Sequence, residues 1–270
     1  MRYALGKSGE FTIEDYHKAK AFSSFFPGIA GLTGIPLWAF YVNRGQCISS
    51  FGTNDKDGAI LEFLPANQAY NLTSVKGFRT FMRIIREGSA SYYEPFKDDT
   101  CHSSKDVIRR MIIRSYELEI EEVNTLMEIK TSVLYITVPN EPFGGLARKV
   151  TLTNMSRKKT ELELIDGLPQ IIPYGMTEWH QKHMSRTIEA WMITSNLGKK
   201  APFYSLKIDP QDRPELEFIK QGNFYMAFQK SGKSVKQLGV IIDPDIVFGL
   251  NGDISYPRVF AQDGWSILGT

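Results

Sequence analysis

The chain has 270 residues, of which 42% are hydrophobic and 23% are charged, a composition that is ordinary for a folded globular protein and argues against disorder. Its 32 basic and 30 acidic residues leave a net charge of +2, which gives no electrostatic reason to expect nucleic acid or an anionic membrane as a partner. The sequence lacks an apolar secretory signal near its N-terminus and any run of about 18 apolar residues. We therefore expect a cytoplasmic protein that does not cross a membrane.

The spacing of apolar residues predicts mostly β-strands. Over residues 109–122, Leu118 and Ile120 share one parity while the glutamates at 117, 119 and 121 share the other, which is typical of a strand with one face on a core. Turn-forming residues at 154–159 predict that 147–166 form a hairpin. We expect strands at 36–42, 47–52, 60–64, 78–84, 109–122, 126–138, 147–154, 160–166, 224–229 and 238–243. Because no strand–helix alternation is visible, the expected fold class is mainly β with antiparallel sheets.

One or two short helices are expected beside these strands. Apolar residues recur at helical spacing over 177–195, with Trp179, Ile188 and Trp191 among them. Thr177 is a suitable N-cap, and the residues at 196–198 provide a stop that ends in glycine. The sequence therefore predicts a single helix over 177–195.

The histidines do not form a recognisable metal or catalytic motif. His180 and His183 are three residues apart and the glutamate precedes them, whereas the zinc-protease pattern needs H-E-x-x-H. Solvated or capping roles are expected for both rings. Cys101 and His102 are adjacent, so on a strand they would point to opposite faces and make a poor catalytic dyad. We expect no metal site and no catalytic residue in this chain.

Two further patterns receive structural interpretations. The glycine-rich residues 28–34 lead toward a strand and do not open a helix, so they lack the dipole that holds a phosphate. Cys47 and Cys101 do not match the spacing of a disulfide scaffold or a zinc knuckle, and both are expected to be reduced thiols.

Aromatic and planar polar side chains gather around the connection between the first two expected strands. Sugars are bound by aromatic faces and by amide or guanidinium groups that match pairs of hydroxyls. The candidates for substrate binding are Trp38, Tyr41, Asn43, Arg44 and Gln46, with Asn67, Gln68 and Tyr70 in a second expected loop. The same residues fit core aromatics plus a hairpin turn in which Gly45 takes a positive φ, and the residues alone favour this turn interpretation.

Long stretches of the chain resemble a known family. They are WAFYVNRGQCISSFGTNDKDGAILEFLPANQAY at 38–70, GFRTFMRI at 77–84 and KVTLTNMSRKKTELELIDGLPQIIPYGM at 149–176. Together they resemble the N-terminal region of glycoside phosphorylases related to cellobiose phosphorylase, and the branch that includes 1,2-β-oligoglucan phosphorylases in particular. The similarity covers most of residues 20–265.

The resemblance implies a fold and a role. In those enzymes the N-terminal region is a large antiparallel β-sandwich, the supersandwich, similar to galactose mutarotase-like proteins. An (α/α)₆ barrel follows it and carries the catalytic aspartate and the phosphate site, and phosphate cleaves the glycosidic bond with inversion to release a sugar 1-phosphate. For this chain the resemblance implies an N-terminal extension at 1–30 and a supersandwich domain at 31–270 that is incomplete at its C-terminus.

The leading hypothesis is thus a phosphorylase sandwich that is inactive without its barrel. No cofactor is expected, and inorganic phosphate is a co-substrate of the whole enzyme. The expected partners are a β-linked gluco-oligosaccharide, the barrel in cis or in trans, and a second copy of the chain. One alternative is a free-standing carbohydrate-binding β-sandwich. A less favoured alternative is a mutarotase-like epimerase, which would need a histidine and a carboxylate in one cleft.

Overall fold

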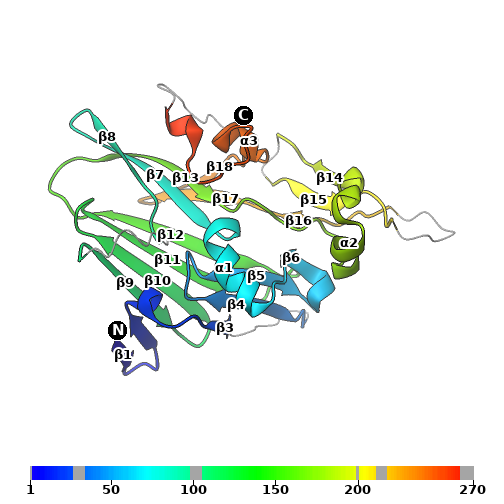
Figure 1. Cartoon of the computed structure of the whole chain (residues 1–270), viewed down its shortest axis with the longest axis horizontal. Coiled ribbons are helices and arrows are strands. Elements are labelled where there is room, and N and C mark those ends of the chain that lie inside the picture. The colour runs from blue at the N-terminus through cyan, green and yellow to red at the C-terminus, as the bar shows by residue number, and fades with distance from the viewer. Residues whose placement is uncertain (1, 27–33, 98–104, 199–200, 211–217, 262–270) are drawn as a thin grey trace. The chain divides into compact units, whose positions relative to one another are not determined.

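The computed structural model describes residues 2–26, 34–97, 105–198, 201–210 and 218–261 (Figure 1). The chain divides into two compact units. The first unit comprises Met1–Asn54 and Glu62–Pro169, and the second comprises Asp55–Leu61 and Gln170–Thr270.

The largest sheet of the first unit has six antiparallel strands in the order β1-β2-β9-β10-β11-β12. Its strands are β1 (Arg2–Leu5), β2 (Phe11–Glu14), β9 (Val107–Ile113), β10 (Glu117–Asn124), β11 (Ile129–Thr137) and β12 (Leu146–Asn154). Strands β10 and β11 alternate strictly, so that Leu118, Ile120, Val133 and Tyr135 are buried on one face.

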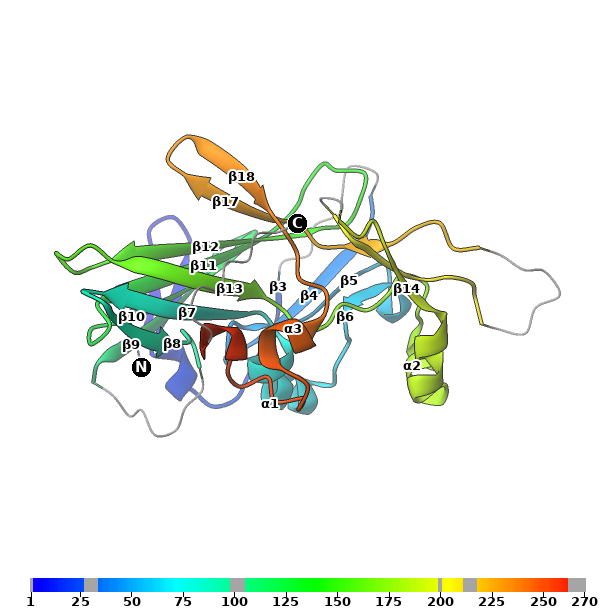
Figure 2. The ribbon, with the colours of Figure 1, turned by 90° about the horizontal axis from the view of Figure 1, so that it is seen from above.

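A second sheet of three strands packs on the six-stranded sheet. It has the order β13-β7-β8, with β7 (Arg79–Arg86), β8 (Ser89–Tyr93) and β13 (Glu161–Gly167). Met82 and Ile84 of β7 form one buried cluster with Ile129 of β11, and the rings of Phe78 and Tyr135 lie 5.9 Å apart. Figure 2 shows β7 and β13 beside β11 and β12. The two sheets make an antiparallel β-sandwich, which confirms the expected fold class.

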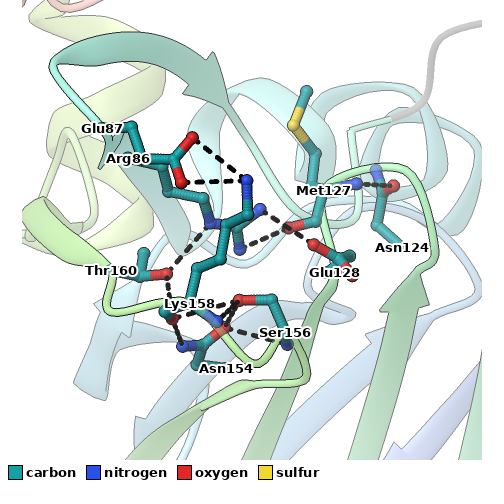
Figure 3. A network of polar contacts seen from close by, with 9 residues as sticks. All are labelled: Arg86, Glu87, Asn124, Met127, Glu128, Asn154, Ser156, Lys158 and Thr160. Atoms are coloured by element: carbon teal, nitrogen blue, oxygen red, sulfur yellow. Dashed lines mark hydrogen bonds and ion pairs between the residues drawn. The ribbon is translucent and has the colours of Figure 1, made fainter.

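Three turns between strands are linked to one another at one end of this sandwich (Figure 3). Arg86 donates a hydrogen bond from Nε to Thr160 Oγ1 at 2.9 Å and from Nη2 to the carbonyl oxygen of Met127 at 2.8 Å. Lys158 Nζ lies 3.0 Å from a carboxylate oxygen of Glu87. The turns that follow β7, β10 and β12 are therefore linked by side chains as well as by the core.

A smaller antiparallel group completes the first unit. It consists of β3 (Ser23–Phe26), β4 (Leu37–Val42) and β5 (Ile48–Thr53), and the helix α1 (Ala66–Lys76) contacts all three strands. A 3₁₀ turn, η1 (Tyr16–Lys18), lies between β2 and β3. Residues 2–26, which the sequence places in an N-terminal extension, thus supply strands to two sheets of this unit.

The second unit has its own core of Ile172, Met176, Ile188 and Leu206. It contains a three-stranded antiparallel sheet, β14-β15-β16, and an isolated hairpin, β17-β18. Its elements are η2 (Lys56–Gly58), β6 (Ala59–Leu61), α2 (Glu178–His183), η3 (Ser185–Trp191), β14 (Met192–Ser195), β15 (Phe203–Leu206), β16 (Asn223–Phe224), β17 (Ala227–Ser231), β18 (Ser234–Leu238), α3 (Pro244–Phe248) and η4 (Arg258–Ala261).

The structure corrects two predictions about strands. Residues 109–122 are not one strand, because the chain turns at 114–116 between β9 and β10. Residues 147–166 are not a hairpin, because β12 pairs with β11 whereas β13 pairs with β7 in the other sheet. In both places a short polar turn connects strands whose partners the local pattern does not specify.

Helical predictions also change in extent. The predicted helix over 177–195 is the short helix α2 followed by η3 and the strand β14, although Thr177 does cap α2 as expected. The expected loop with Asn67, Gln68 and Tyr70 is part of α1. Toward the C-terminus, the strands expected at 224–229 and 238–243 are replaced by β16, β17 and β18.

Within the described residues, no helix is long and apolar enough to cross a membrane.

Candidate functional site

The connection between β4 and β5 forms the predicted turn. Residues 43–47 link the strands, with hydrogen bonds from the Val42 amide to the Cys47 carbonyl oxygen and from the Cys47 amide to the Arg44 carbonyl oxygen, both 2.9 Å. Gly45 has φ +50°, as expected, and a Cβ at this position would lie 2.9 Å from the Cα atom of Ser74 in α1. The turn therefore packs against a helix, and its glycine is required by both backbone conformation and space.

Asn43 is directed into the protein and is 1% exposed. Its Oδ1 accepts a hydrogen bond from the Phe22 amide at 2.9 Å, and its Nδ2 donates to the carbonyl oxygens of Tyr16 and Lys20 at 3.1 and 3.2 Å. The side-chain amide of Asn43 is thus fully hydrogen-bonded to backbone groups, and it holds the chain segment before β3 in place. The hydrogen-bonding groups that a sugar would use are already occupied.

Gln46 belongs to a buried polar network between the two sheets of the sandwich. Its Nε2 donates to Thr80 Oγ1 at 2.9 Å, its Oε1 accepts from Arg148, and its carbonyl oxygen accepts from the Tyr135 hydroxyl at 2.7 Å. Arg148 also donates to Thr80 Oγ1 and to Asp166 Oδ1, both at 3.0 Å. Gln46 thus joins the turn to β7, β11 and β12, and Arg148 extends the network to Asp166 of β13.

Tyr41 and Arg44 are also held by neighbouring groups. Tyr41 is buried, and this burial raises the pKa of its hydroxyl. The Arg44 guanidinium lies 4.6 Å from the centre of the Tyr70 ring, which is a cation–π geometry. Cys47 forms no disulfide and is fully buried.

Trp38 lies in a different environment from the other four candidates. It points away from the face of β4 on which Ala39 and Tyr41 are buried, and it is half-buried. Its ring makes an edge contact with Phe63 at 5.6 Å and a tilted contact with Phe40 at 6.2 Å. Of the five candidates, Tyr41, Asn43 and Gln46 are therefore buried, whereas Arg44 and Trp38 are partly exposed.

Four rings form a continuous patch, which we call the aromatic surface: Phe25, Trp38, Phe40 and Phe63. Phe40 connects the patch, because its ring centre is 5.8 Å from those of both Phe25 and Phe63. Phe25 is 53% exposed and Phe63 is 44% exposed. A contiguous patch of partly exposed aromatic rings is a candidate binding surface.

The backbone explains why these rings meet. Phe25 and Phe40 are direct partners in the β3–β4 pair, and Trp38 lies two residues from Phe40, so all three point to one side. Ser50 of β5 fixes the segment that carries Phe63, because its Oγ donates to the Glu62 carbonyl oxygen at 2.8 Å and accepts from the Leu64 amide at 3.4 Å.

Sequence reasoning identified one ring of the aromatic surface. The alternation that relates Trp38 to Phe40 was visible, and it could have placed both on one face. Phe63 lay in an expected strand without an assigned partner, and Phe25 lay in the expected N-terminal extension. Because the pairing of β3 with β4 is not encoded in a local pattern, these two rings could not be assigned to the surface.

The histidines of α2 fulfil the predicted local roles, and one of them has an additional neighbour. His180 forms a capping box with Thr177, and His183 stacks on Trp179 with ring centres 4.9 Å apart. His180 Nε2 lies 3.9 Å from Asp209 Oδ1, a carboxylate that the sequence did not suggest. The His180 ring is almost fully buried, so it does not offer an imidazole to a solvent-borne substrate.

Some candidates are outside the described residues. These are Cys101, His102 and the glycine-rich residues 28–33. Among the residues that the structure describes, no group of three or more histidine, cysteine or carboxylate side chains is arranged to hold a metal ion.

The fold and the aromatic surface define this chain as a mainly β protein with an antiparallel sandwich that exposes aromatic rings. No protein-family model matches the sequence, and no curated protein matches it significantly. Membership of the glycoside phosphorylases therefore stays a prediction.

Proposed function

We propose that the chain is the non-catalytic β-sandwich portion of a glycoside phosphorylase, and that its aromatic surface holds a β-linked gluco-oligosaccharide. The observation that carries the proposal is the contiguous set of Phe25, Trp38, Phe40 and Phe63 on an exposed sheet face. The axial hydrogens of β-linked glucose units form flat apolar faces that suit aromatic rings, and the two exposed rings provide such contacts at low entropic cost.

In this proposal the chemistry belongs to another part of the enzyme. An (α/α)₆ barrel, in cis or in trans, supplies the general acid and binds inorganic phosphate, and the whole enzyme releases a sugar 1-phosphate in the cytoplasm. The sandwich presents one part of the oligosaccharide to that barrel and supports assembly with it or with a second copy.

The aromatic surface is tested by binding of β-linked gluco-oligosaccharides, measured by titration calorimetry. Phe25→Ala and Phe63→Ala should each weaken binding by roughly fivefold, because one ring contact contributes about 1 kcal/mol. Phe228→Ala in β17 is the matched control, since Phe228 is also exposed but lies outside the surface. Equal affinity in all three variants would remove the surface from the proposal.

A substrate-binding role for Arg44 is tested in the same titration. Because its guanidinium already packs on Tyr70, we expect Arg44→Ala to leave the oligosaccharide affinity within twofold of the wild type. A loss of tenfold or more, in a variant with an unchanged unfolding curve, would return Arg44 to the binding site.

Phosphorolysis tests the assignment to an enzyme. The polypeptide encoded directly downstream should release sugar 1-phosphate from the oligosaccharide with phosphate when it is produced together with this chain, and much more slowly without it. An equal rate in both cases would refute the phosphorylase role. The exposed rings also favour a free-standing carbohydrate-binding module, which would bind with the same affinity whether or not the downstream product is present.

A further inference from the structure

The second unit contains an open cavity of about 380 Å³, which lies at the lower end of the range for small-ligand sites. It is lined by residues of β14 and β15 and by the segment 218–221. Its position in the second unit makes it independent of the aromatic surface, so an inference about it does not rest on the proposed function.

Backbone pairing builds the walls of this cavity. In the β14–β15 pair Ile193 is opposite Ser205. Two residues after Ser205, the Lys207 amide donates to the Trp191 carbonyl oxygen at 2.8 Å. The segment with Lys220 lies beside this strand, because the Ile219 amide donates to the Lys207 carbonyl oxygen at 3.2 Å. The two lysines are therefore brought to one cavity from positions thirteen residues apart in the sequence.

Phe203, one of the lining residues, lies close to the backbone of Gly222. A Cβ at Gly222 would lie 2.9 Å from both Cβ and Cδ1 of Phe203, so the absence of a side chain at 222 lets the Phe203 ring lie against the backbone. Phe218 adds a second and more exposed ring to the lining. The site thus offers apolar ring surfaces beside its polar groups.

The polar lining is basic and rich in hydroxyl and amide groups. Lys207 and Lys220 supply two ammonium groups, while Ser195, Ser205 and Asn196 supply hydroxyl and amide groups. No carboxylate is among the described lining residues. Among the described residues, no carboxylate oxygen lies within 4.0 Å of the ammonium nitrogen of Lys207 or Lys220. A ligand with negative charge and several hydroxyls would satisfy these groups together.

The geometry points to a binding site for a phosphorylated monosaccharide. The two lysines hold the phosphate as point charges, the hydroxyl and amide groups receive the sugar hydroxyls, and a ring such as Phe218 packs on the sugar face. A neutral sugar would leave the lysines without their counter-charge, and free phosphate would leave the ring and the amide unused.

Binding to the whole chain is tested with glucose 1-phosphate and glucose 6-phosphate, followed by NMR chemical shifts and calorimetry, with glucose and inorganic phosphate as partial ligands. At least one sugar phosphate should perturb the cavity residues and bind about tenfold or more tightly than either partial ligand. Lys207→Gln and Lys220→Gln should each weaken it by about tenfold, and Lys207→Arg by much less, since a charged hydrogen bond is lost only in the first two.

Lys236→Gln is the matched control, because Lys236 lies in β18 and outside the cavity lining. Its affinity should equal that of the wild type, and amide shifts outside the cavity should show that all variants are folded. Three results would overturn the inference: no binding of either sugar phosphate, binding of phosphate alone with equal affinity, or an equal loss in the Lys236→Gln variant.

Discussion

Asn43 is the residue whose role changes most between the sequence and the structure. Its amide contacts the chain segment before β3 through three carbonyl oxygens and one amide. Asn43→Ala should lower the free energy of unfolding by about 2–4 kcal/mol, because buried backbone groups lose their partners. Urea unfolding followed by circular dichroism measures this, with Asn67→Ala on the exposed side of α1 as a control that should change stability by less than about 0.5 kcal/mol. Equal effects in the two variants would contradict the assignment.

His17 gives the first unit a dependence on pH. Burial lowers the pKa of His17 to about 4, with the nearby charges of Arg109 and Lys18 contributing. Its Nδ1 is buried and has no hydrogen-bond partner among the described residues. As the pH falls below about 6.5, the unfolded chain binds a proton that the folded chain accepts only near pH 4, so stability is lost across this interval.

The variant His17→Gln should remove this part of the pH dependence. We expect its unfolding free energy to decline less than that of the wild type between pH 6.5 and 4, as measured by urea unfolding at several pH values. Wild-type and variant curves that remain parallel over this interval would show that the His17 ring is accessible to protons in the folded protein.

At the scale of elements, the two sheets of the sandwich are joined by a polar contact as well as by the core. Arg148 on β12 and Asp166 on β13 form an ion pair across the sheets, with Thr80 and Gln46 in the same network. Arg148→Gln should cost about 2–4 kcal/mol of stability, because it leaves the carboxylate and the amide without their cation in a largely buried place.

A second pair provides the matched comparison for Arg148. Arg83 and Glu163 are cross-strand partners within one sheet and are more exposed, with Arg83 Nη1 3.1 Å from Glu163 Oε2. Arg83→Gln should cost less than about 1 kcal/mol, because solvent screens an exposed pair. Unfolding curves that shift equally for the two variants would show that the Arg148 network adds nothing beyond a surface ion pair.

Local patterns predicted strand positions well but not strand partners. Leu118 and Ile120 are buried, and Glu119 between them lies on the opposite face, as the alternation indicated. In β9 the buried residues are the odd-numbered Arg109 and Met111, whereas the buried Leu118 and Ile120 of β10 are even-numbered. The parity changes because the turn at 114–116 separates the two strands. Helix α1 gave little signal because it buries just Ala69 and Thr73. The same limit applies to the site: Trp38 was found, but its neighbours Phe25 and Phe63 depend on pairing and a tertiary contact.

At the scale of the whole molecule, each unit has its own core, and the first unit leaves part of its core face open. Leu162 and Leu164 of β13 are directly opposite Ile84 and Met82, so they lie on the inner face of their sheet. They are nevertheless 39% and 43% exposed, whereas their partners are buried. Strand β13 is also an edge strand of its sheet. An apolar edge of this kind favours association with another chain.

The replacement of both leucines tests this consequence. The wild type should self-associate as its concentration rises, and the double variant Leu162→Gln, Leu164→Gln should do so several-fold less, as measured by sedimentation velocity. Leu126→Gln is the control, because Leu126 is exposed in the turn after β10 and away from a sheet edge. A wild type that stays monomeric at high concentration, or a control that lowers association equally, would show that the open face of β13 is not an association surface. If the wild type does associate through β13, its open core face is covered by another polypeptide in the assembled protein. The phosphorylase proposal requires such a covering, because it places a barrel or a second copy beside the sandwich.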